Sequence, residues 1–527
     1  NRTTYMILLL WAAVCFALLV VDWCCWAPNR LDADMASEQL LANLLAQEGS
    51  VMSTNWYYST ELRVLNTQLV MAPLFRLFTS WHTVRVVGSV VLILLYLAAW
   101  FWFGRSAKLK YSGLLGAGLL VLPYGALYRQ YVLEGLYYIP HIAISFVVLG
   151  CAVRILRGGR RLAPAAGMVL FSFAAALGGP RQLFILNIPL TVAAALLCWL
   201  DAPPADTLRQ KLANAWRTPG GALLVPTLAA DAAALAGYLV NAKVLAEKYH
   251  FQDQGYVAFT GLNLDRLQWF VNALLASFGW QEGKVFSLAA LFNLAAAALI
   301  LFCFVFSVRL VRGKARYPLG HRLVGAFFLA GAVCFALLYG LTNSGHSDRY
   351  LLPLAILFVP LLEIMLADCT PLHRPDARGL TALLAAILLL RAGTDYRAAA
   401  VATNPNQGAA QFLVQNGYRD GYASFWDGNV MTELTDGTLN VWTLTPNSVP
   451  ELRPWLQVTS HLQTPPQGKI FFVISKWEAY GERQPTTQAL ADAMPEDALI
   501  YEDKTVKIYG FASDEAMRQA CGFAAFP

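Results

Sequence analysis

The sequence predicts an α-helical polytopic membrane protein that ends in a smaller α/β domain. The chain has 527 residues, of which 57% are hydrophobic and only 14% charged, whereas soluble domains carry about 25% charged residues. Apolar runs recur up to residue 395, and many approach the roughly 20 residues that a helix needs to cross the hydrocarbon core. Beyond that point the composition turns polar. We therefore divide the chain into a membrane domain, 1–395, and a C-terminal domain, 396–527.

The apolar runs make about eleven candidate transmembrane helices. They lie near residues 5–26, 84–103, 111–127, 138–156, 164–179, 182–200, 220–240, 285–308, 321–342, 350–367 and 378–394. The first run lacks the small-residue cleavage site of a signal peptide, so we expect it to be a retained span.

Basic residues fix the orientation of these spans. They gather in alternate loops, among them 105–110, 154–161 and 309–322, and cytoplasmic loops carry the excess of Lys and Arg. Loops 27–83 and 241–284 are then expected outside, and an odd number of spans puts the C-terminal domain outside too. The sequence thus predicts a multi-pass protein of the plasma (inner) membrane. Because the net charge of +6 comes from these loops, we expect membrane lipids and not nucleic acid as partners.

The outer segments contain expected secondary structure of their own. Four leucines recur at helical spacing over 35–48 and predict an amphipathic helix on the membrane interface, and residues 262–278 predict a second. In the C-terminal domain, β-prone runs at 439–444, 469–475, 498–502 and 505–511 alternate with helical stretches near 407–416 and 484–493. Asp427-Gly428 and Asp436-Gly437 are expected to be turns between strands.

Three carboxylates follow the first span closely: Asp32, Asp34 and Glu38. Asp34 and Glu38 are four residues apart, which places both on one face of a helix. Such a pair can take a proton from an attacking hydroxyl or hold a divalent cation. Alternatively, Asp32 or Asp34 caps the helix and Glu38 favours its positive end.

The same outer loop continues with aromatic and hydrogen-bonding residues, Tyr57, Tyr58, Glu61 and Arg63. Aromatic rings beside polar side chains suit a sugar ring. An interfacial belt of Trp and Tyr would explain the two tyrosines but not Glu61 and Arg63.

Arginines stand where two later spans begin on the outer side. One start carries Arg181 and Gln182, and the other carries His346, Asp348, Arg349 and Tyr350. A helix N-terminus with an arginine attracts anions, and a lipid phosphate is the anion at that depth. Alternatively, the arginines snorkel to lipid headgroups or pair with a carboxylate such as Asp348, and His346 is an ordinary hydrogen-bonding residue.

These features resemble the polytopic glycosyltransferases of the GT-C class, in particular protein O-mannosyltransferases and the aminoarabinose transferase of lipid A. The acidic first outer loop, the interfacial helix after it, the Arg-Gln pair and the Arg-Tyr-x-x-Pro element at 349–353 carry the resemblance. It implies that Asp32 or Asp34 is the base and that Arg349 with Tyr350 faces the lipid phosphate. This chain has Asp-Ala-Asp in place of the adjacent Asp-Glu pair of those relatives, and it lacks their Lys-Pro-Pro element.

The resemblance implies a glycosyltransferase that moves a sugar, with inversion, from a polyprenyl-phosphate carrier to an extracytoplasmic acceptor, which could be a glycan, a lipid or a protein. A divalent cation, Mg²⁺ or Mn²⁺, is compatible with two Asp and one Glu, although their spacing does not require one. The alternative hypothesis is a flippase or transporter of lipid-linked sugars that performs no bond chemistry.

Overall fold

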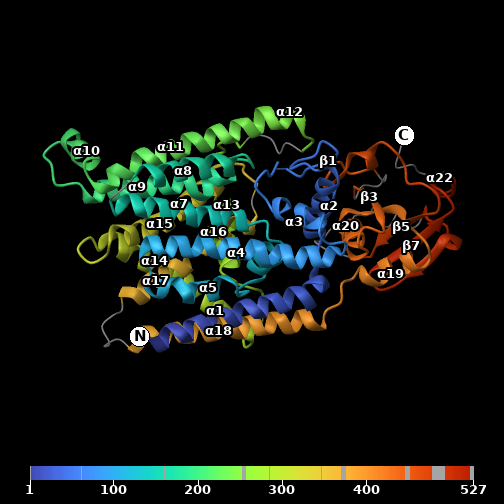
Figure 1. Cartoon of the computed structure of the whole chain (residues 1–527), viewed down its shortest axis with the longest axis horizontal. Coiled ribbons are helices and arrows are strands. Elements are labelled where there is room, and N and C mark those ends of the chain that lie inside the picture. The colour runs from blue at the N-terminus through green and yellow to red at the C-terminus, as the bar shows by residue number, and fades with distance from the viewer. Residues whose placement is uncertain are drawn as a thin grey trace.

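Long helices packed side by side form the larger part of the molecule, and a sheet domain covers one end of them (Figure 1). A computed structural model describes residues 2–60, 62–158, 161–251, 257–283, 285–345, 347–368, 375–445, 451–476 and 493–522. Two of the residues singled out above, Glu61 and His346, lie outside the described residues, as does most of the predicted helix at 484–493.

The helical bundle confirms the prediction of a polytopic membrane protein. Within the described residues, eight helical segments are long and apolar enough to cross a membrane: 2–25, 81–107, 139–156, 183–201, 219–248, 288–312, 319–341 and 348–367. The main helices are α1 Arg2–Cys25, α4 Trp81–Ala107, α7 Ile139–Leu156, α8 Leu162–Ala176, α9 Ile188–Asp201, α11 Pro219–Val240, α14 Leu288–Arg312, α15 Leu319–Leu341, α17 Phe358–Asp368 and α18 Pro375–Val401. The shorter α8 and the final α18 match two further predicted spans.

Several predicted spans are extended or interrupted by short segments. These are the 3₁₀ turns η2 Lys110–Gly113 and η6 Asp348–Leu351, the π-helical segments η3 Arg129–Glu134, η4 Leu183–Asn187 and η5 Asn241–Leu245, and the helices α5 Leu114–Leu120, α6 Ala126–Tyr128, α12 Ala246–Lys248 and α16 Leu352–Ala355. The short helix α10 Leu208–Trp216 lies in the loop between α9 and α11.

The predicted span 111–127 is not one helix. After α5 the chain leaves helical geometry at Val121 and resumes it only at α6. Pro123 has no backbone N–H and disfavours the helical conformation of the residue before it, which explains the break. The structure therefore has a short helix packed against α1 and α17 here, where hydropathy alone predicted a continuous span.

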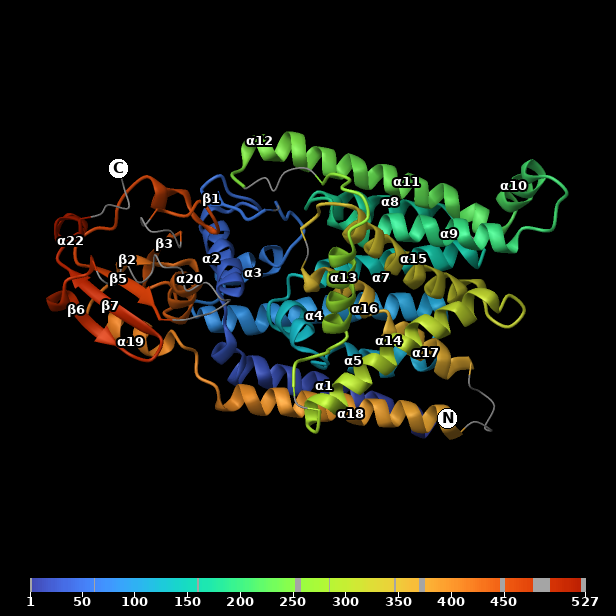
Figure 2. The same ribbon diagram turned by 180° about the vertical axis from the view of Figure 1, so that it is seen from behind.

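Two helices lie across the bundle instead of along it (Figure 2). The first is α2 Ala33–Glu48, which confirms the helix predicted over 35–48, and the second is α13 Leu264–Ser277, which confirms the one over 262–278. α2 begins where the Asp32 side chain accepts a hydrogen bond from Met35 N–H, and it ends at Gly49, whose φ of 70° suits a helix C-terminus. The short η1 Ala27–Arg30 and α3 Gln68–Phe75 flank α2.

The C-terminal domain is an α/β domain built on one five-stranded sheet. The strands are β2 Asp420–Ser424, β3 Asn440–Leu444, β5 Ile470–Ser475, β6 Leu499–Glu502 and β7 Val506–Phe511, in the order β3-β2-β5-β7-β6. β2 runs parallel to β3 and β5, and the other pairs are antiparallel. Helices α19 Gln407–Gln415, α20 Phe425–Leu434 and α22 Asp514–Cys521 and the 3₁₀ turns η7 Thr459–Leu462 and η9 Glu496–Ala498 complete the described part of the domain. The four predicted strands are confirmed, whereas β2 was not predicted.

One of the two predicted turns is wrong. Asp427 and Gly428 lie in the first turn and a half of α20, because the Ser424 hydroxyl accepts a hydrogen bond from Asp427 N–H and thereby caps that helix. The other prediction is confirmed, since Asp436 and Gly437 have φ values of 49° and 74° and turn the chain before β3.

Polar contacts join the C-terminal domain to the bundle, both directly and through α2. Arg85 of α4 makes a buried, two-pronged ion pair with Glu433 of α20, with N–O distances of 2.6 and 2.7 Å, and also donates to the Met35 carbonyl. Asn429 of α20 donates to the Ser37 hydroxyl at 2.8 Å. A small antiparallel sheet adds to this junction, because β1 Trp56–Tyr57 from the first outer loop pairs with β4 Gln457–Val458. α2 is therefore held between the two parts of the molecule.

Candidate functional site

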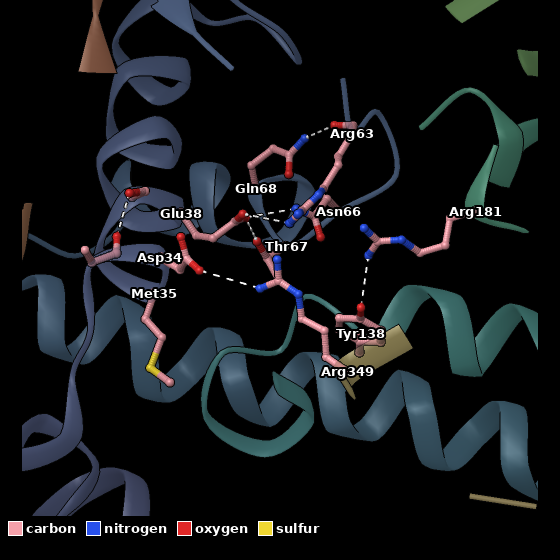
Figure 3. Close-up of polar contacts among 12 residues, drawn as sticks. Asp34, Met35, Glu38, Arg63, Asn66, Thr67, Gln68, Tyr138, Arg181 and Arg349 are labelled. Atoms are coloured by element: carbon pink, nitrogen blue, oxygen red, sulfur yellow. Dashed lines mark hydrogen bonds and ion pairs between the residues drawn. The ribbon is translucent and has the colours of Figure 1, made fainter. Parts of the chain in front are cut away.

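A pocket opens where α2, the segment 56–68, the start of η6 and the C-terminal domain meet. Its free volume is about 830 Å³, a figure that includes space open to solvent. Its described lining contains Asp34, Ser37, Glu38, Leu41, Trp56, Tyr58, Ser59, Thr60, Arg63, Asn66, Gln68, Tyr137, Arg181, Arg349, Tyr350, Trp455 and Leu456. Figure 3 shows its polar groups.

Asp34 and Arg349 face each other across this pocket (Figure 3). The Asp34 Oδ2 to Arg349 Nη1 distance is 3.7 Å, and the two side chains are 34% and 29% exposed. The Arg349 guanidinium also lies over the Tyr131 ring, and its Nε is buried without a hydrogen-bond partner. A carboxylate and a guanidinium in such loose contact can each exchange their partner for a ligand, because an exposed ion pair contributes little stability.

Asp32 occupies a different position from Asp34, two residues away. Its Oδ1 accepts from Met35 N–H at 2.8 Å, and its Oδ2 accepts from the Gln130 amide at 2.9 Å. Burial, and next the neighbouring Asp34 carboxylate, raise the pKa of Asp32. Asp32 is not part of the pocket lining; both of its oxygens hold the start of α2 in place.

Glu38 lies one turn after Asp34 on the same face of α2, as their spacing predicted. Its carboxylate accepts from Asn66 Nδ2 at 2.9 Å and from the Thr67 hydroxyl, and its Oε1 lies 3.5 Å from Arg63 Nη1. Three donors from the 63–67 segment thus converge on one carboxylate. Glu38 therefore anchors that segment against α2, whereas Asp34 keeps its carboxylate open to the pocket.

Arg181 brings a third guanidinium to the pocket. It lies between α8 and η4, donates to the Tyr138 hydroxyl at 3.3 Å and stacks over the Tyr350 ring at 4.9 Å. The described lining thus contains three arginines against two carboxylates. Because guanidinium groups bind phosphate with two parallel hydrogen bonds, this excess of positive charge favours an anionic ligand.

The other predicted site residues divide between pocket and scaffold. Tyr58 lines the pocket, and its hydroxyl accepts from Ser53 N–H at 3.0 Å; burial raises its pKa to about 12. Tyr57 packs on His250 with ring centroids 5.1 Å apart, outside the pocket lining. Gln182 is fully buried against His141. The Asp348 side chain is exposed and does not line the pocket.

Ten of the described lining residues were not among the site residues predicted from the sequence, and three of these lie outside the first outer loop: Tyr137, Trp455 and Leu456. Tyr137 directly precedes the predicted span 138–156, a position where aromatic residues are common for reasons unrelated to a site. Trp455 and Leu456 belong to the C-terminal domain, where the Leu456 N–H donates to the Tyr57 carbonyl at 2.8 Å. No sequence pattern shows that a distant domain closes one wall of the pocket.

A divalent cation does not fit the described carboxylates well. Within the described ranges, no three His, Cys, Asp or Glu side chains gather as a metal site requires, and Glu38 is already occupied by three donors. The described carboxylates are therefore assigned no role as metal ligands.

Comparison with known proteins shows the fold. No model of a known protein family matches the chain, and no curated protein matches its sequence. The structure is similar to ArnT from Cupriavidus metallidurans in the apo state, with a TM-score of 0.55, 14% identity, and 97% of this chain and 98% of that chain covered. The crystal structure of the same protein bound to undecaprenyl phosphate gives a TM-score of 0.54, 12% identity and the same coverage. The chain therefore has the GT-C fold, as the resemblance predicted.

Proposed function

We propose that the chain is a membrane glycosyltransferase that moves a sugar from a polyprenyl-phosphate carrier to an acceptor outside the cytoplasm, with inversion at the anomeric carbon. One observation carries the proposal: an open carboxylate, Asp34, and an open guanidinium, Arg349, share one pocket 3.7 Å apart. The fold supports it, because a protein of the same fold has been crystallised with undecaprenyl phosphate.

The donor phosphate binds to Arg349 and Arg181 in this proposal. Arg349 is the second residue of η6, and η6 leads directly into the span that ends at 367. A phosphate on Arg349 is therefore at headgroup depth, where the isoprenoid tail can follow the apolar helices. Arg181 comes from the start of another span and faces the same pocket, so the two guanidinium groups can bind different phosphate oxygens.

The transfer is a single displacement. Asp34 takes the proton of an acceptor hydroxyl as its oxygen forms a bond to the anomeric carbon, and the bond from that carbon to the phosphate oxygen breaks. The electron pair of the broken bond leaves on the phosphate, where Arg349 stabilises the developing charge. One displacement at carbon inverts its configuration.

The ion pair between Asp34 and Arg349 has to open during this reaction. In an in-line displacement the attacking and leaving oxygens lie on opposite faces of the anomeric carbon, so their protein partners are farther apart than 3.7 Å. The donor phosphate draws Arg349 away, and this frees Asp34 to act as a base.

We propose an inner-membrane location with the C-terminal domain outside the cytoplasm. α10 and the basic turn after α14 lie at the end of the bundle opposite the C-terminal domain (Figure 1). Loops rich in Lys and Arg stay in the cytoplasm, and this orientation puts the pocket on the outer side of the membrane. A lipid-linked sugar can serve as the donor there in place of a soluble nucleotide sugar.

The test is donor turnover in detergent solution, where no compartments exist to transport between. The purified parent is incubated with a panel of radiolabelled polyprenyl-phosphate sugars, beside Arg349→Ala and the matched control Arg419→Ala. Arg419 is exposed in the C-terminal domain, so its variant should match the parent. We expect Arg349→Ala to lower kcat by about 10²–10³-fold, the cost of losing one charge-stabilising group. If Arg349→Ala turns over the donor as fast as the parent, the site assignment is wrong, and if the parent only moves intact donor across vesicle membranes, it is a flippase.

A further inference from the structure

A second cleft lies on the other side of α2 from the catalytic pocket. Its free volume is about 590 Å³, a figure that includes space open to solvent, and it lies between α2 and the elements α20, β3, β4 and η7 of the C-terminal domain. We call it the amide cleft and define it by Asn43, Gln47, Asn440, Gln457, Trp56 and Trp81, all of which line it. Its function is not explained by the transfer chemistry described above.

The lining of the amide cleft is uncharged and combines amide side chains with apolar ones. Among the described residues that line it, none is Asp, Glu, Lys or Arg. The one titratable group among them is His461, whose ring nitrogens lie 3.2 Å from the Gln457 amide oxygen and 2.9 Å from the Asn440 amide oxygen. Burial lowers the pKa of His461 to about 3, so this ring is neutral at physiological pH. A charged ligand would find no counter-ion in the cleft.

Two of the amides are available to a ligand. Asn43 and Gln47 lie one turn apart on the face of α2 that borders the cleft, and neither side chain hydrogen-bonds to another residue in the described part of the chain. Each carboxamide offers a donor and an acceptor, and a sugar hydroxyl both donates and accepts. Two such groups at helical spacing can therefore bind neighbouring hydroxyls of one ligand.

Trp56 connects the amide cleft with the catalytic pocket. It lines both cavities, is 1% exposed, and its indole N–H has no hydrogen-bond partner. A buried donor without a partner is costly, because it lost its water without gaining a protein acceptor. Trp56 and Trp81 are 1% and 5% exposed, so they belong to the apolar wall of the cleft and leave its amides as the groups that a ligand can reach.

We propose that the amide cleft binds a neutral oligosaccharide, and, building on the proposed function, that this oligosaccharide is part of the acceptor. An extended peptide is less suited to the cleft, since peptides are commonly bound by backbone hydrogen bonds along a strand edge, whereas the free groups here are side-chain amides on a helix. The cleft thus holds the unreacting part of an acceptor glycan beside the pocket in which Asp34 acts.

The test measures binding of defined probes to the full-length chain in detergent by saturation-transfer NMR. The probes are two neutral tetrasaccharides, chitotetraose and mannotetraose, one acidic tetrasaccharide of galacturonic acid, and a neutral hexapeptide of Gly, Ser and Ala. Asn43→Leu with Gln47→Met removes the hydrogen-bonding groups while keeping size and helix propensity. Gln411→Met with Gln415→Met is the matched control, since those glutamines are also one turn apart on an exposed face of a helix, α19.

We expect the parent and the control pair to bind at least one neutral tetrasaccharide, and the cleft pair to bind it at least about tenfold more weakly because two hydrogen bonds are lost. Asn440→Ser should weaken binding from the opposite wall, independently of α2. Binding of neither neutral tetrasaccharide by the parent, equal binding by the cleft pair, or binding of the hexapeptide alone would overturn the proposal. Donor turnover by the same parent preparation separates the two proposals. Turnover without glycan binding refutes only the cleft. Glycan binding without turnover refutes the transferase and the acceptor role, and leaves the cleft as a glycan-binding site.

Discussion

The same substitution, Asp to Asn, should have opposite consequences at Asp32 and Asp34. Asp34→Asn keeps the size of the side chain but removes the basic oxygen that faces Arg349 in the pocket. Losing a general base typically costs about 10²–10⁴-fold in rate, so we expect kcat for sugar transfer to fall by about that factor. Stability should change little, because the ion pair that is lost is loose and partly exposed.

Asp32→Asn should keep kcat for sugar transfer within about tenfold of the parent value. That decrease is smaller than the decrease caused by the loss of a general base. Asn caps a helix about as well as Asp, so its oxygen can still accept from Met35 N–H, as Asp32 does at 2.8 Å. Asp32→Ala, in contrast, loses the cap at about 1 kcal/mol and leaves the Gln130 amide without its acceptor, which costs about another 1 kcal/mol. That variant should show a lower apparent melting temperature.

The pH dependence of stability gives a second, independent measure of Asp32. Burial and the Asp34 carboxylate raise its pKa in the folded protein, so the folded state holds this proton to higher pH than the unfolded state does. The stability that the protonated carboxyl contributes is complete below its ordinary pKa near 4 and is lost as the pH rises through the raised value. Asn stays neutral at every pH. The melting temperature of Asp32→Asn minus that of the parent should therefore increase as the pH rises from about 4.

The assay is the initial rate of transfer at saturating donor, normalised to the amount of folded enzyme, with Asp497→Asn as control because Asp497 is exposed in the C-terminal domain. The assignment of roles is refuted if Asp32→Asn is as inactive as Asp34→Asn. It is equally refuted if Asp34→Asn retains the rate of the control.

Three further predictions concern the donor site, the domain junction and the C-terminal domain. Arg181→Ala should raise the KM for donor by about tenfold, since it removes a phosphate contact made before the chemical step; an unchanged KM in steady-state kinetics would contradict this role. Glu433→Leu leaves Arg85 buried without its partner and should lower the free energy of unfolding by about 3–5 kcal/mol. The double variant Glu433→Leu with Arg85→Met removes the unpaired charge, so thermal unfolding should show most of that stability restored. Burial lowers the pKa of His461 to about 3, so the folded state favours the neutral ring. The stability that this neutral ring contributes is complete above about pH 6.5. As the pH falls below that value, the free energy of unfolding drops by up to about 1.4 kcal/mol per pH unit. His461→Phe keeps the stack on Trp442 and should flatten the acid side of the melting curve against pH; a slope equal to that of the parent would exclude His461 as the cause.

Hydropathy predicted the membrane domain well, because a span is decided by some twenty consecutive side chains. It failed at 111–127, where Pro123 interrupts the helix although the composition stays apolar. In the C-terminal domain the four strands with β-branched and aromatic residues were predicted, whereas β2 was not. α20 contains Gly428 and Asn429, which are poor helix formers, and its contacts with α2 override that local preference.

The site was predictable in part. Asp34 and Arg349 were predicted from their positions, because one stands at the start of an outer helix and the other at the start of a later span. Both positions lie in the same layer at the membrane surface. The choice between Asp32 and Asp34 depended on the first residue of α2, and a helix boundary is uncertain by one or two residues when only the sequence is known. With Ala33 as the first helical residue, Asp32 becomes the cap and Asp34 faces the pocket.

The C-terminal domain contributes to the geometry of the proposed active site and is not simply attached to it. α2 carries both carboxylates of the described pocket lining, and it is fixed from the bundle by Arg85, which donates to the Met35 carbonyl, and from the C-terminal domain by Asn429, which donates to Ser37. Arg85 in turn is paired with Glu433 of that same domain. Catalysis by a base requires placement to a fraction of an ångström, so the position of Asp34 relative to Arg349 depends on how that domain docks. A helix lying across the bundle would not by itself provide that placement.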